Sequence, residues 1–180
     1  HIDILVNNAG AIPRGSLEQI NDEVLRQAWD VKVFGTMDLC RHYLPLMRAA
    51  RKGVILNLVG AAGEMCDPAY FAGSVGNAAL IALTKTLGST SIEDGVRVVG
   101  VNPGPVMTER LMDSMKKRAA DRLGDAQRWS EIAARMPAGR PATVQEVAAT
   151  VALLCSPLSA YTSGALINID GGLSNRRPVV

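Results

Sequence analysis

The chain has 180 residues, which suits one domain with enough length to bury a core. Its net charge of +2 and its 48% hydrophobic residues are ordinary for a water-soluble protein and do not indicate binding to nucleic acid or to an anionic membrane. No apolar run is long enough for a membrane span, and the first residues lack the basic region of a signal peptide. Three widely spaced cysteines (Cys40, Cys66, Cys155) predict reduced thiols, so we expect a cytoplasmic protein without a metal site.

The first half of the chain alternates short apolar runs with helical patterns. Residues 2–6 predict a strand buried on both faces, and a turn of small residues follows at 7–10. A helix is expected over 22–47 with Asn21 as its N-cap, then a strand over 54–58 and a loop over 60–69. Residues 74–88 predict a helix that is apolar nearly all round, as in a core or a subunit interface.

The second half continues the same alternation. A strand over 96–101 runs into a turn at 102–105, and a charged, methionine-bearing helical excursion follows over 109–135. Thr143 and Glu146 have the spacing of a capping box and open a helix through residue 154. A strand over 165–169 and a loose tail over 174–180 complete the chain.

Strands that alternate with helices predict an α/β fold with a doubly wound parallel sheet. A domain seldom starts with a central strand, because such a strand needs neighbours on both sides. We therefore expect that an N-terminal part of the domain is absent from this chain. In such sheets ligands bind beyond the carboxyl ends of the strands. Those ends are rich in glycine and in small or polar residues here, which favours a site, although each turn alone could be merely a tight connection.

An ordered series of motifs resembles the classical short-chain dehydrogenase/reductase family. Asn7-Asn8-Ala9-Gly10 follows a strand, and Asn102-Pro103-Gly104-Pro105-Val106-Met107-Thr108 follows another. Ile169-Asp170-Gly171-Gly172 stands at the end, and Leu44-Pro45-Leu46-Met47 and Gly139-Arg140-Pro141 agree in order and spacing. Each motif is weak by itself, whereas the ordered series covers essentially the whole chain.

The resemblance implies a Rossmann fold with strand order 3-2-1-4-5-6-7, NAD or NADP as cofactor, and a homo-oligomer, dimeric or tetrameric. It also implies that this chain corresponds to the C-terminal two-thirds of a member, without the glycine-rich phosphate-binding turn. Residues 1–180 then form a single truncated domain, in which the excursion over 107–140 covers the substrate. The matching positions for cofactor binding are Asn7, Ala9, Gly10, Asn77, Pro103, Gly104, Val106 and Thr108.

The resemblance also locates four catalytic positions, and all four carry other residues. The family's tyrosine, its lysine four residues later and its serine thirteen residues before fall on Gly73, Asn77 and Gly60. The family's asparagine falls on Lys32. Glycine cannot donate a proton or orient a carbonyl, and an asparagine carries no charge that could shift a neighbour's pKa. Chemistry by the family's usual route should therefore be severely impaired.

Two side chains could restore part of this chemistry. Tyr70 lies three residues before Gly73 and could bring a phenol to the nicotinamide, or it could simply cover the core or a subunit contact. Lys32 lies on the apolar stripe of its helix, where a lysine needs a partner. It could reach toward Asn77 and the cofactor ribose, or extend to solvent.

The sequence leaves three functions open. The first is an NAD(P)-binding oxidoreductase that acts on a carbonyl or a secondary alcohol, with altered or weak catalysis. The second is a non-catalytic, pseudoenzyme-like binding or scaffold subunit. The third is a fragment that folds only within an oligomer.

Overall fold

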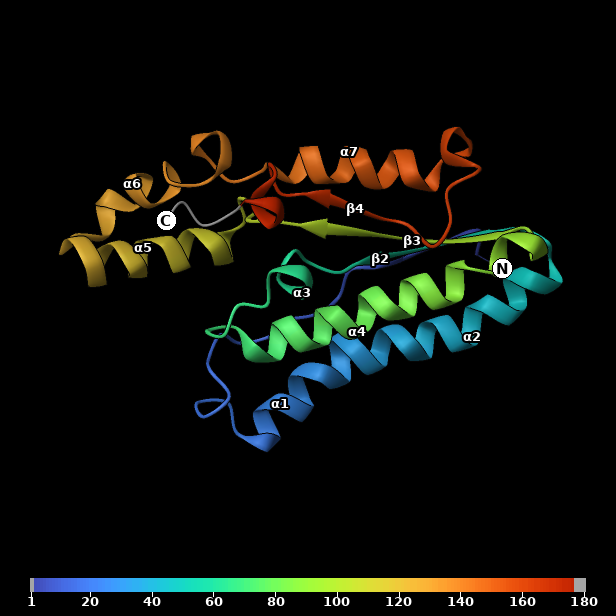
Figure 1. The fold of residues 1–180 in the computed structure, drawn as a ribbon, viewed down its shortest axis with the longest axis horizontal. Coiled ribbons are helices and arrows are strands. Elements are labelled where there is room, and N and C mark those ends of the chain that lie inside the picture. The colour runs from blue at the N-terminus through green and yellow to red at the C-terminus, as the bar shows by residue number, and fades with distance from the viewer. Residues whose placement is uncertain (1, 177–180) are drawn as a thin grey trace.

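The sheet consists of four parallel strands. The computed structural model describes residues 2–176, and its strands are β1 (Ile4–Asn7), β2 (Gly53–Leu58), β3 (Val96–Pro103) and β4 (Leu166–Ile169). They lie in the order β1-β2-β3-β4, and every pairing is parallel (Figure 1). This arrangement confirms the predicted α/β fold with a parallel sheet.

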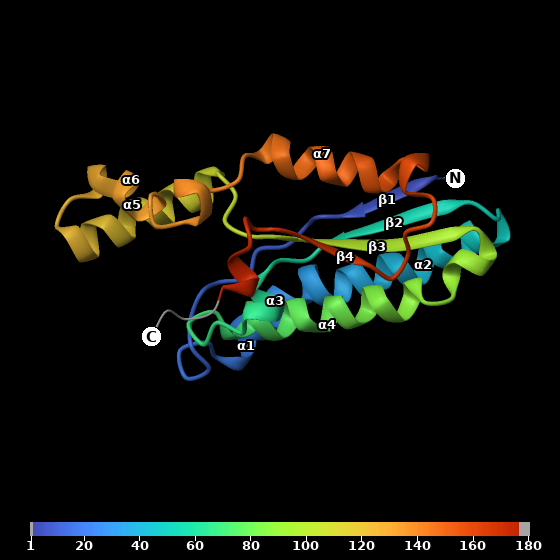
Figure 2. The ribbon, with the colours of Figure 1, turned by 45° about the horizontal axis from the view of Figure 1, so that its top comes forward.

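Helices cover both faces of the sheet. α1 (Asp22–Trp29), α2 (Gly35–Ala49) and α4 (Phe71–Gly88) lie on one face, and α7 (Val144–Cys155) lies on the other (Figure 2). Successive strand residues point to opposite faces. Ile55 therefore packs in the core beside α2, whereas Leu56 packs with Leu154 of α7. Apolar residues on both faces of β2 and β3 are the pattern expected for buried parallel strands.

The long helix expected over 22–47 is not a uniform α-helix. α1 runs into a π-helical segment, Asp30–Phe34, which continues into α2 up to Ala49. The amide of Gly35 bonds to the carbonyl of Asp30, five residues back, which is the π-helical spacing. The wider turn changes the direction in which its side chains project, and Lys32 is one of them.

Three local predictions are corrected. The strand at 2–6 was expected to be buried on both faces, but β1 is the edge strand of the described sheet, and Ile4 and Val6 are 48% and 41% exposed. The loop at 60–69 contains a short helix, α3 (Ala62–Met65). The helical excursion divides into α5 (Glu109–Leu123) and α6 (Trp129–Ala133), because Gly124 takes a left-handed conformation and ends α5.

The predicted tail over 174–180 is described only as far as Arg176. Leu173–Asn175 form a 3₁₀ turn, and residues 177–180 lie outside the described residues. Within the described part, no helix is long and apolar enough to cross a membrane.

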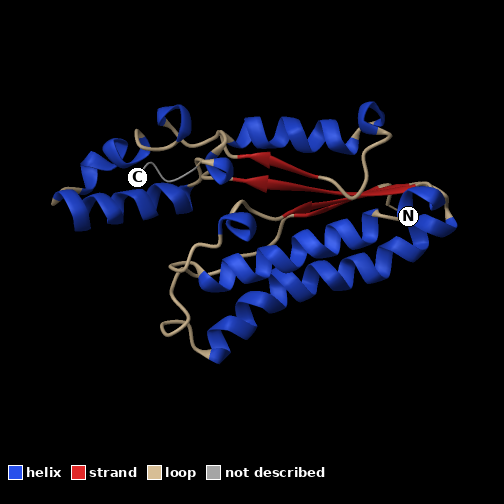
Figure 3. Cartoon of the chain, in the orientation of Figure 1, coloured by secondary structure: helices blue, strands red, loops and turns tan. Residues whose placement is uncertain are grey.

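The carboxyl ends of the strands point to one end of the molecule, which is on the left in Figure 3. α3, α5 and α6 lie at the same end. This is where the sequence predicted a ligand site, and the polar and glycine-containing turns after the strands meet there.

Candidate cofactor and substrate site

A cavity of about 790 Å³ runs between the exposed edge strand β1 and α7, from Ile4 and Cys155 to the turns at the carboxyl ends of the strands. Its lining includes residues that are far apart in the sequence but were predicted to share a site: Gly10, Lys32, Gly60, Pro103, Gly104, Val106 and Thr108. Asn8 and Val59 also line it and were not among the predicted site residues. Asn8 belongs to the Asn7–Gly10 motif, whereas no pattern in the sequence distinguishes Val59.

The turn after β3 presents free polar groups to this cavity. Within the described residues, the backbone N–H and C=O of Val106 make no hydrogen bond. The Thr108 hydroxyl accepts a bond from the Leu111 amide as the N-cap of α5, which leaves its own proton free to be donated. A carboxamide needs both donors and acceptors, so this turn suits the carboxamide of a nicotinamide.

Three other residues that were predicted to bind the cofactor do not line the cavity. The Asn7 side chain donates to Asn57 Oδ1 at 2.9 Å and to Cys40 Sγ at 3.6 Å, so it faces the core and not the cavity. Ala9 is not among the residues that line the cavity. Asn77 is 2% exposed, and its buried Oδ1 has no hydrogen-bond partner among the described residues. An unpartnered buried oxygen is costly, so Asn77 suits a ligand hydroxyl.

Lys32 points into the cavity from the π-helical segment. Its Nζ donates a hydrogen bond to the backbone carbonyl of Val59 at 2.7 Å, and its aliphatic stem packs across Gly10. Burial, together with the nearby charge of Arg110, lowers the pKa of Lys32 to about 8. The contact with Val59 places the ammonium beside the Gly60 turn, and no hydrogen bond joins Lys32 to Asn77 among the described residues.

The Asn77 amide occupies the space that a side chain at position 60 would need. An ideal Cβ built on Gly60 would lie 2.9 Å from Asn77 Nδ2. Gly60 also has a φ of +140°, which residues with a side chain rarely adopt. The glycine at the family's serine position is therefore required by the backbone as well as by the packing of Asn77.

The aromatic ring of Tyr70 fills the corresponding space at position 73. An ideal Cβ on Gly73 would overlap the Cε1 and Cζ atoms of the Tyr70 ring. Tyr70 is the N-cap residue of α4, so its ring folds back over the first turn of that helix. The structure thus brings a tyrosine ring to the helix position where the family carries its tyrosine, from a residue three positions earlier.

Tyr70 lies in a partly apolar and strongly cationic environment. It packs with Ile12 and Ala72, and the guanidinium carbon of Arg14 lies 5.2 Å from the centre of its ring. Burial raises the pKa of the Tyr70 phenol, while the charges of Arg110 and Arg14 act in the opposite direction. The phenol therefore keeps its proton at neutral pH.

A hydrogen-bond network of two amides and one carboxylate, of which only Asn102 is buried, holds the turn after β2 in place. The Gly60 amide lies 3.5 Å from Asn102 Oδ1, and Asn102 Nδ2 donates to Asn168 Oδ1 at 2.9 Å. Glu64 of α3 accepts from Asn102 at 3.3 Å and from Asn168 at 2.7 Å. This network joins the ends of β2, β3 and β4, and no sequence pattern indicated it.

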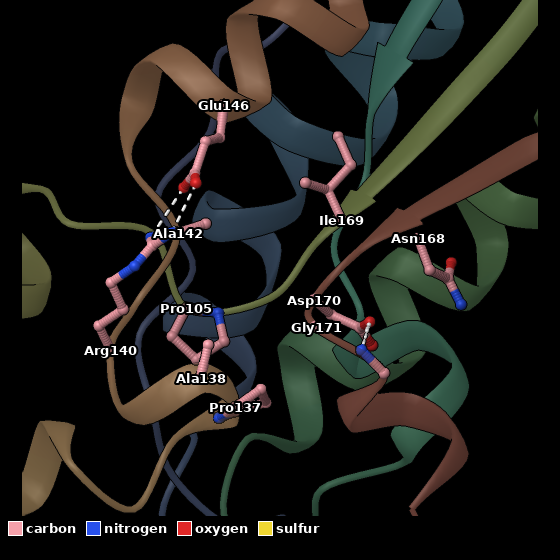
Figure 4. Close-up of a pocket in the computed structure, with 11 residues that line it drawn as sticks. Pro105, Pro137, Ala138, Arg140, Ala142, Glu146, Asn168, Ile169, Asp170 and Gly171 are labelled. Carbon is pink, nitrogen blue, oxygen red and sulfur yellow. Dashed lines mark hydrogen bonds and ion pairs between the residues drawn. The ribbon is translucent and has the colours of Figure 1, made fainter.

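A second hollow, of about 450 Å³, lies between the 137–142 segment and the turn after β4 (Figure 4). Its charged groups already have partners. Arg140 donates to both carboxylate oxygens of Glu146, and Asp170 accepts from the amides of Gly172 and Ser174 at 2.8 and 2.7 Å. Arg140, Glu146 and Asp170 stabilise the helix cap and the turn, so their charged groups are already engaged within the described chain. The described residues contain no group of three or more His, Cys, Asp or Glu that could hold a metal ion.

The fold and the site together define a nucleotide-binding α/β domain whose ligand cavity lies at the carboxyl ends of a parallel sheet. Residues 1–174 match the model of the family described as enoyl-(acyl carrier protein) reductase. The chain belongs to the short-chain dehydrogenase/reductase family.

The relatives are oxidoreductases of several kinds. An uncharacterized oxidoreductase of Thermotoga maritima is 32% identical over 171 residues, which are 95% of this chain and 66% of that protein. A 2-keto-3-deoxy-L-fuconate dehydrogenase of Xanthomonas campestris is 31% identical over 96% of this chain and 57% of its own length. The chain therefore spans two-thirds or less of the length of these relatives.

The structure of L-sorbose reductase from Gluconobacter frateurii, complexed with NADPH and L-sorbose, superimposes with a TM-score of 0.87. It is 30% identical, and the match covers 97% of this chain and 68% of that one. Xylitol dehydrogenase bound to NAD⁺, at 22% identity and a TM-score of 0.85, shares the fold. These likenesses confirm the Rossmann-type fold that the motifs predicted.

Proposed function

We propose that this protein is an NAD(P)-dependent oxidoreductase that acts on a carbonyl or a secondary alcohol with a rearranged set of acid–base groups. The observation that carries the proposal is the position of the Tyr70 ring over Gly73, the position of the family's tyrosine, in a fold whose cavity is lined by the turn that matches the family's nicotinamide-binding segment. The relatives that match the chain include dehydrogenases and reductases, which supports the same reaction class.

The cavity has the groups that a nicotinamide nucleotide requires. Val106 offers a backbone N–H and C=O that make no hydrogen bond to the described residues, and Thr108 offers a hydroxyl proton for the carboxamide. Asn77 does not line the cavity itself, but its amide lies next to Gly60, which does, and its Oδ1 has no partner among the described residues, so we propose it for a ribose hydroxyl. When bound, NAD(P) supplies or accepts the hydride of the reaction. Gly104 and Gly60 line the same cavity without side chains that would fill it.

Tyr70 is proposed as the proton donor to a substrate carbonyl. Because burial raises the pKa of its phenol, Tyr70 is protonated at neutral pH and can donate a hydrogen bond to a carbonyl oxygen. The raised pKa keeps the proton on the phenol and makes Tyr70 a weaker acid, so its role is to donate a hydrogen bond to the carbonyl oxygen and to release the proton only as negative charge develops there. A proton donor in position typically contributes about 10²–10⁴ in rate.

Lys32 is proposed to supply the positive charge that the family places at the position of Asn77. Its ammonium rests on the Val59 carbonyl, next to Gly60 and therefore close to the ribose-binding side of the cavity. With a pKa of about 8, it remains mostly charged at neutral pH. The charge and the amide are thus exchanged between the two positions, Lys32 and Asn77.

The replacement of all four family groups favours a second candidate, a non-catalytic member that binds the cofactor or acts as a scaffold. Neither Gly60 nor Gly73 carries a functional group, and Asn77 carries no charge.

We also propose that the protein forms a dimer or tetramer. Val31 and Phe34 are 55% and 47% exposed on the long helix, and a partner subunit would bury such apolar side chains.

The test is a titration of the full-length protein with NADH and with NADPH, followed by nicotinamide fluorescence, and then a screen of carbonyl substrates by absorbance. Saturable binding with turnover of any ketone supports the oxidoreductase. Binding without turnover supports the non-catalytic candidate. A folded full-length protein that binds neither nucleotide would refute both cofactor-dependent functions.

A further inference from the structure

The amine of Lys32 lies in the wall of the cavity beside a neutral partner. Its Nζ donates to the Val59 carbonyl at 2.7 Å, and Lys32, Val59 and the next residue, Gly60, all line the cavity. Among the described residues Lys32 forms no ion pair, although a buried ammonium without a carboxylate beside it is costly. The proposed function uses the charge of this group and gives no role to its nucleophilic form.

The surroundings of Lys32 favour the neutral amine. No carboxylate is present among the described residues that line the cavity. The charged group that acts on Lys32 from a neighbouring element is Arg110 of α5, whose Nη2 donates to the Ile12 carbonyl at 2.6 Å. Burial and, to a smaller extent, the charge of Arg110 lower the pKa of Lys32 to about 8, so about a tenth of the amine is unprotonated at pH 7. A lysine that is desolvated in an apolar pocket or lies near another cation is the kind that forms Schiff bases with carbonyl compounds.

The cavity has room and apolar walls for a small carbonyl compound. On the side of β1 and α7 its walls are aliphatic (Figure 2): Ile4, Val6, Val147 and Val151. The stem of Lys32 is held against the loop after β1, because an ideal Cβ on Gly10 would lie 2.8 to 2.9 Å from three of its carbon atoms. The amine is therefore fixed at this wall and is not free to extend into solvent.

We propose that Lys32 is a covalent binding site for aldehydes, with which its amine forms an imine inside the cavity. The Nζ lone pair adds to the carbonyl carbon, and the resulting carbinolamine loses water, so the carbonyl oxygen leaves with the two protons of the amine. Before this addition, the neutral amine keeps an N–H for the Val59 carbonyl and has a lone pair for the aldehyde. The apolar walls favour an aldehyde with a short hydrocarbon chain. The reaction needs no nucleotide, so it goes beyond the proposed function and does not depend on it.

The test labels the full-length protein at pH 7 with butanal and sodium cyanoborohydride, without cofactor, and locates the label by peptide mass mapping. Cyanoborohydride delivers a hydride to the imine carbon and leaves a stable secondary amine on the lysine that reacted. Lys85 and Lys116 are exposed on helices and serve as internal standards. We expect Lys32 to be labelled at least about tenfold faster than either of them, because an ordinary lysine is almost wholly protonated at pH 7. Glyceraldehyde, whose hydroxyl groups suit apolar walls poorly, should show a smaller preference for Lys32.

Arg110→Gln should slow the labelling of Lys32 and leave that of Lys85 unchanged, because it removes the nearby positive charge. The control is Arg128→Gln, which should change neither rate, since Arg128 is exposed and paired with Glu131 at 2.6 Å. Selective labelling that Arg110→Gln does not slow would still support the site, with burial alone as its cause. Labelling of Lys32 no faster than that of Lys85, or equal selectivity for the two aldehydes, would overturn the proposal. Failure to bind either nucleotide would count against the proposed function only, because the labelling reaction contains no cofactor.

Discussion

The ring of Tyr70 lies where a side chain of Gly73 would begin, so the two residues act as one packing unit at the start of α4. Glycine at 73 is required because the tyrosine at 70 fills its space. The loss of the family's tyrosine at position 73 and the packing of the Tyr70 ring at that position therefore depend on each other. This relationship makes the first prediction possible.

Gly73→Ala should destabilise the protein by about 1–3 kcal/mol, because the new methyl group would overlap the Tyr70 ring. Alanine is otherwise favoured over glycine within a helix by about 1 kcal/mol. In a Tyr70→Ala background the same substitution should therefore become neutral or stabilising. The measurement is a double-mutant cycle by urea unfolding, with Tyr161→Ala, a change at a fully exposed tyrosine, as the control background. An equal cost of Gly73→Ala in both backgrounds would contradict the proximity of the two residues.

Tyr70→Phe should reduce carbonyl turnover by about 10²–10⁴ while leaving nucleotide affinity nearly unchanged, because only the proton donor is lost. Initial rates of NAD(P)H oxidation and nucleotide titration give the two quantities. Tyr161→Phe is the matched control and should keep full activity, since its side chain is almost entirely exposed. If Tyr70→Phe retained the wild-type rate, another group would have to deliver the proton.

Lys32→Met should stabilise the protein at pH 7 and alter its dependence on pH. The pKa of Lys32 falls from 10.5 to about 8 on folding, so the unfolded chain binds more protons between these values. The free energy of unfolding should therefore rise as the pH rises from about 8 to about 10.5, because folded Lys32 loses its proton first. At pH 7 the buried charge of Lys32 destabilises the folded protein by at most about 3 kcal/mol. Thermal unfolding from pH 7 to pH 10.5 should show this rise in the wild type and a flatter profile in Lys32→Met.

Lys85→Met is the control for that series, because Lys85 is exposed on α4. It should leave the pH profile of the wild type unchanged.

The same Lys32→Met protein should bind nucleotide more weakly at neutral pH if the ammonium contacts the ribose. Unchanged nucleotide affinity would remove Lys32 from the proposed site while leaving the stability prediction intact.

Gly60→Ser would restore the family's serine by sequence but should not restore function. Its backbone φ of +140° is strained for serine, at a cost of about 1–3 kcal/mol, and the new side chain would meet Asn77 Nδ2. Adding Asn77→Ala should recover the part of the lost stability that comes from the clash with Asn77. The part that comes from the strained backbone of residue 60 should remain. Chemical unfolding of the single and double variants measures both parts, and a Gly60→Ser protein as stable as the wild type would contradict the conformation of this turn.

The sequence by itself determined the order of strands and helices and the turn that we propose to bind the cofactor. Apolar runs bounded by turn residues identify buried parallel strands, and the capping box at Thr143 and Glu146 forms as its spacing predicted. The turn after β3, with Val106 and Thr108, was also found in the sequence, because its motif resembles that of the family. Such features depend on residues that are close in the sequence, so a short segment is enough to predict them.

Only the tertiary structure decided where the functional side chains point. The π-helical turn directs Lys32 to the Val59 carbonyl, the φ of Gly60 makes room for the Asn77 amide, and the Tyr70 ring turns back onto Gly73. None of these placements follows from spacing along the chain, because each depends on the space that another segment leaves free. A sequence comparison finds four replaced residues, whereas the folded chain places the Lys32 ammonium in the lining of the cavity and the Tyr70 ring over Gly73.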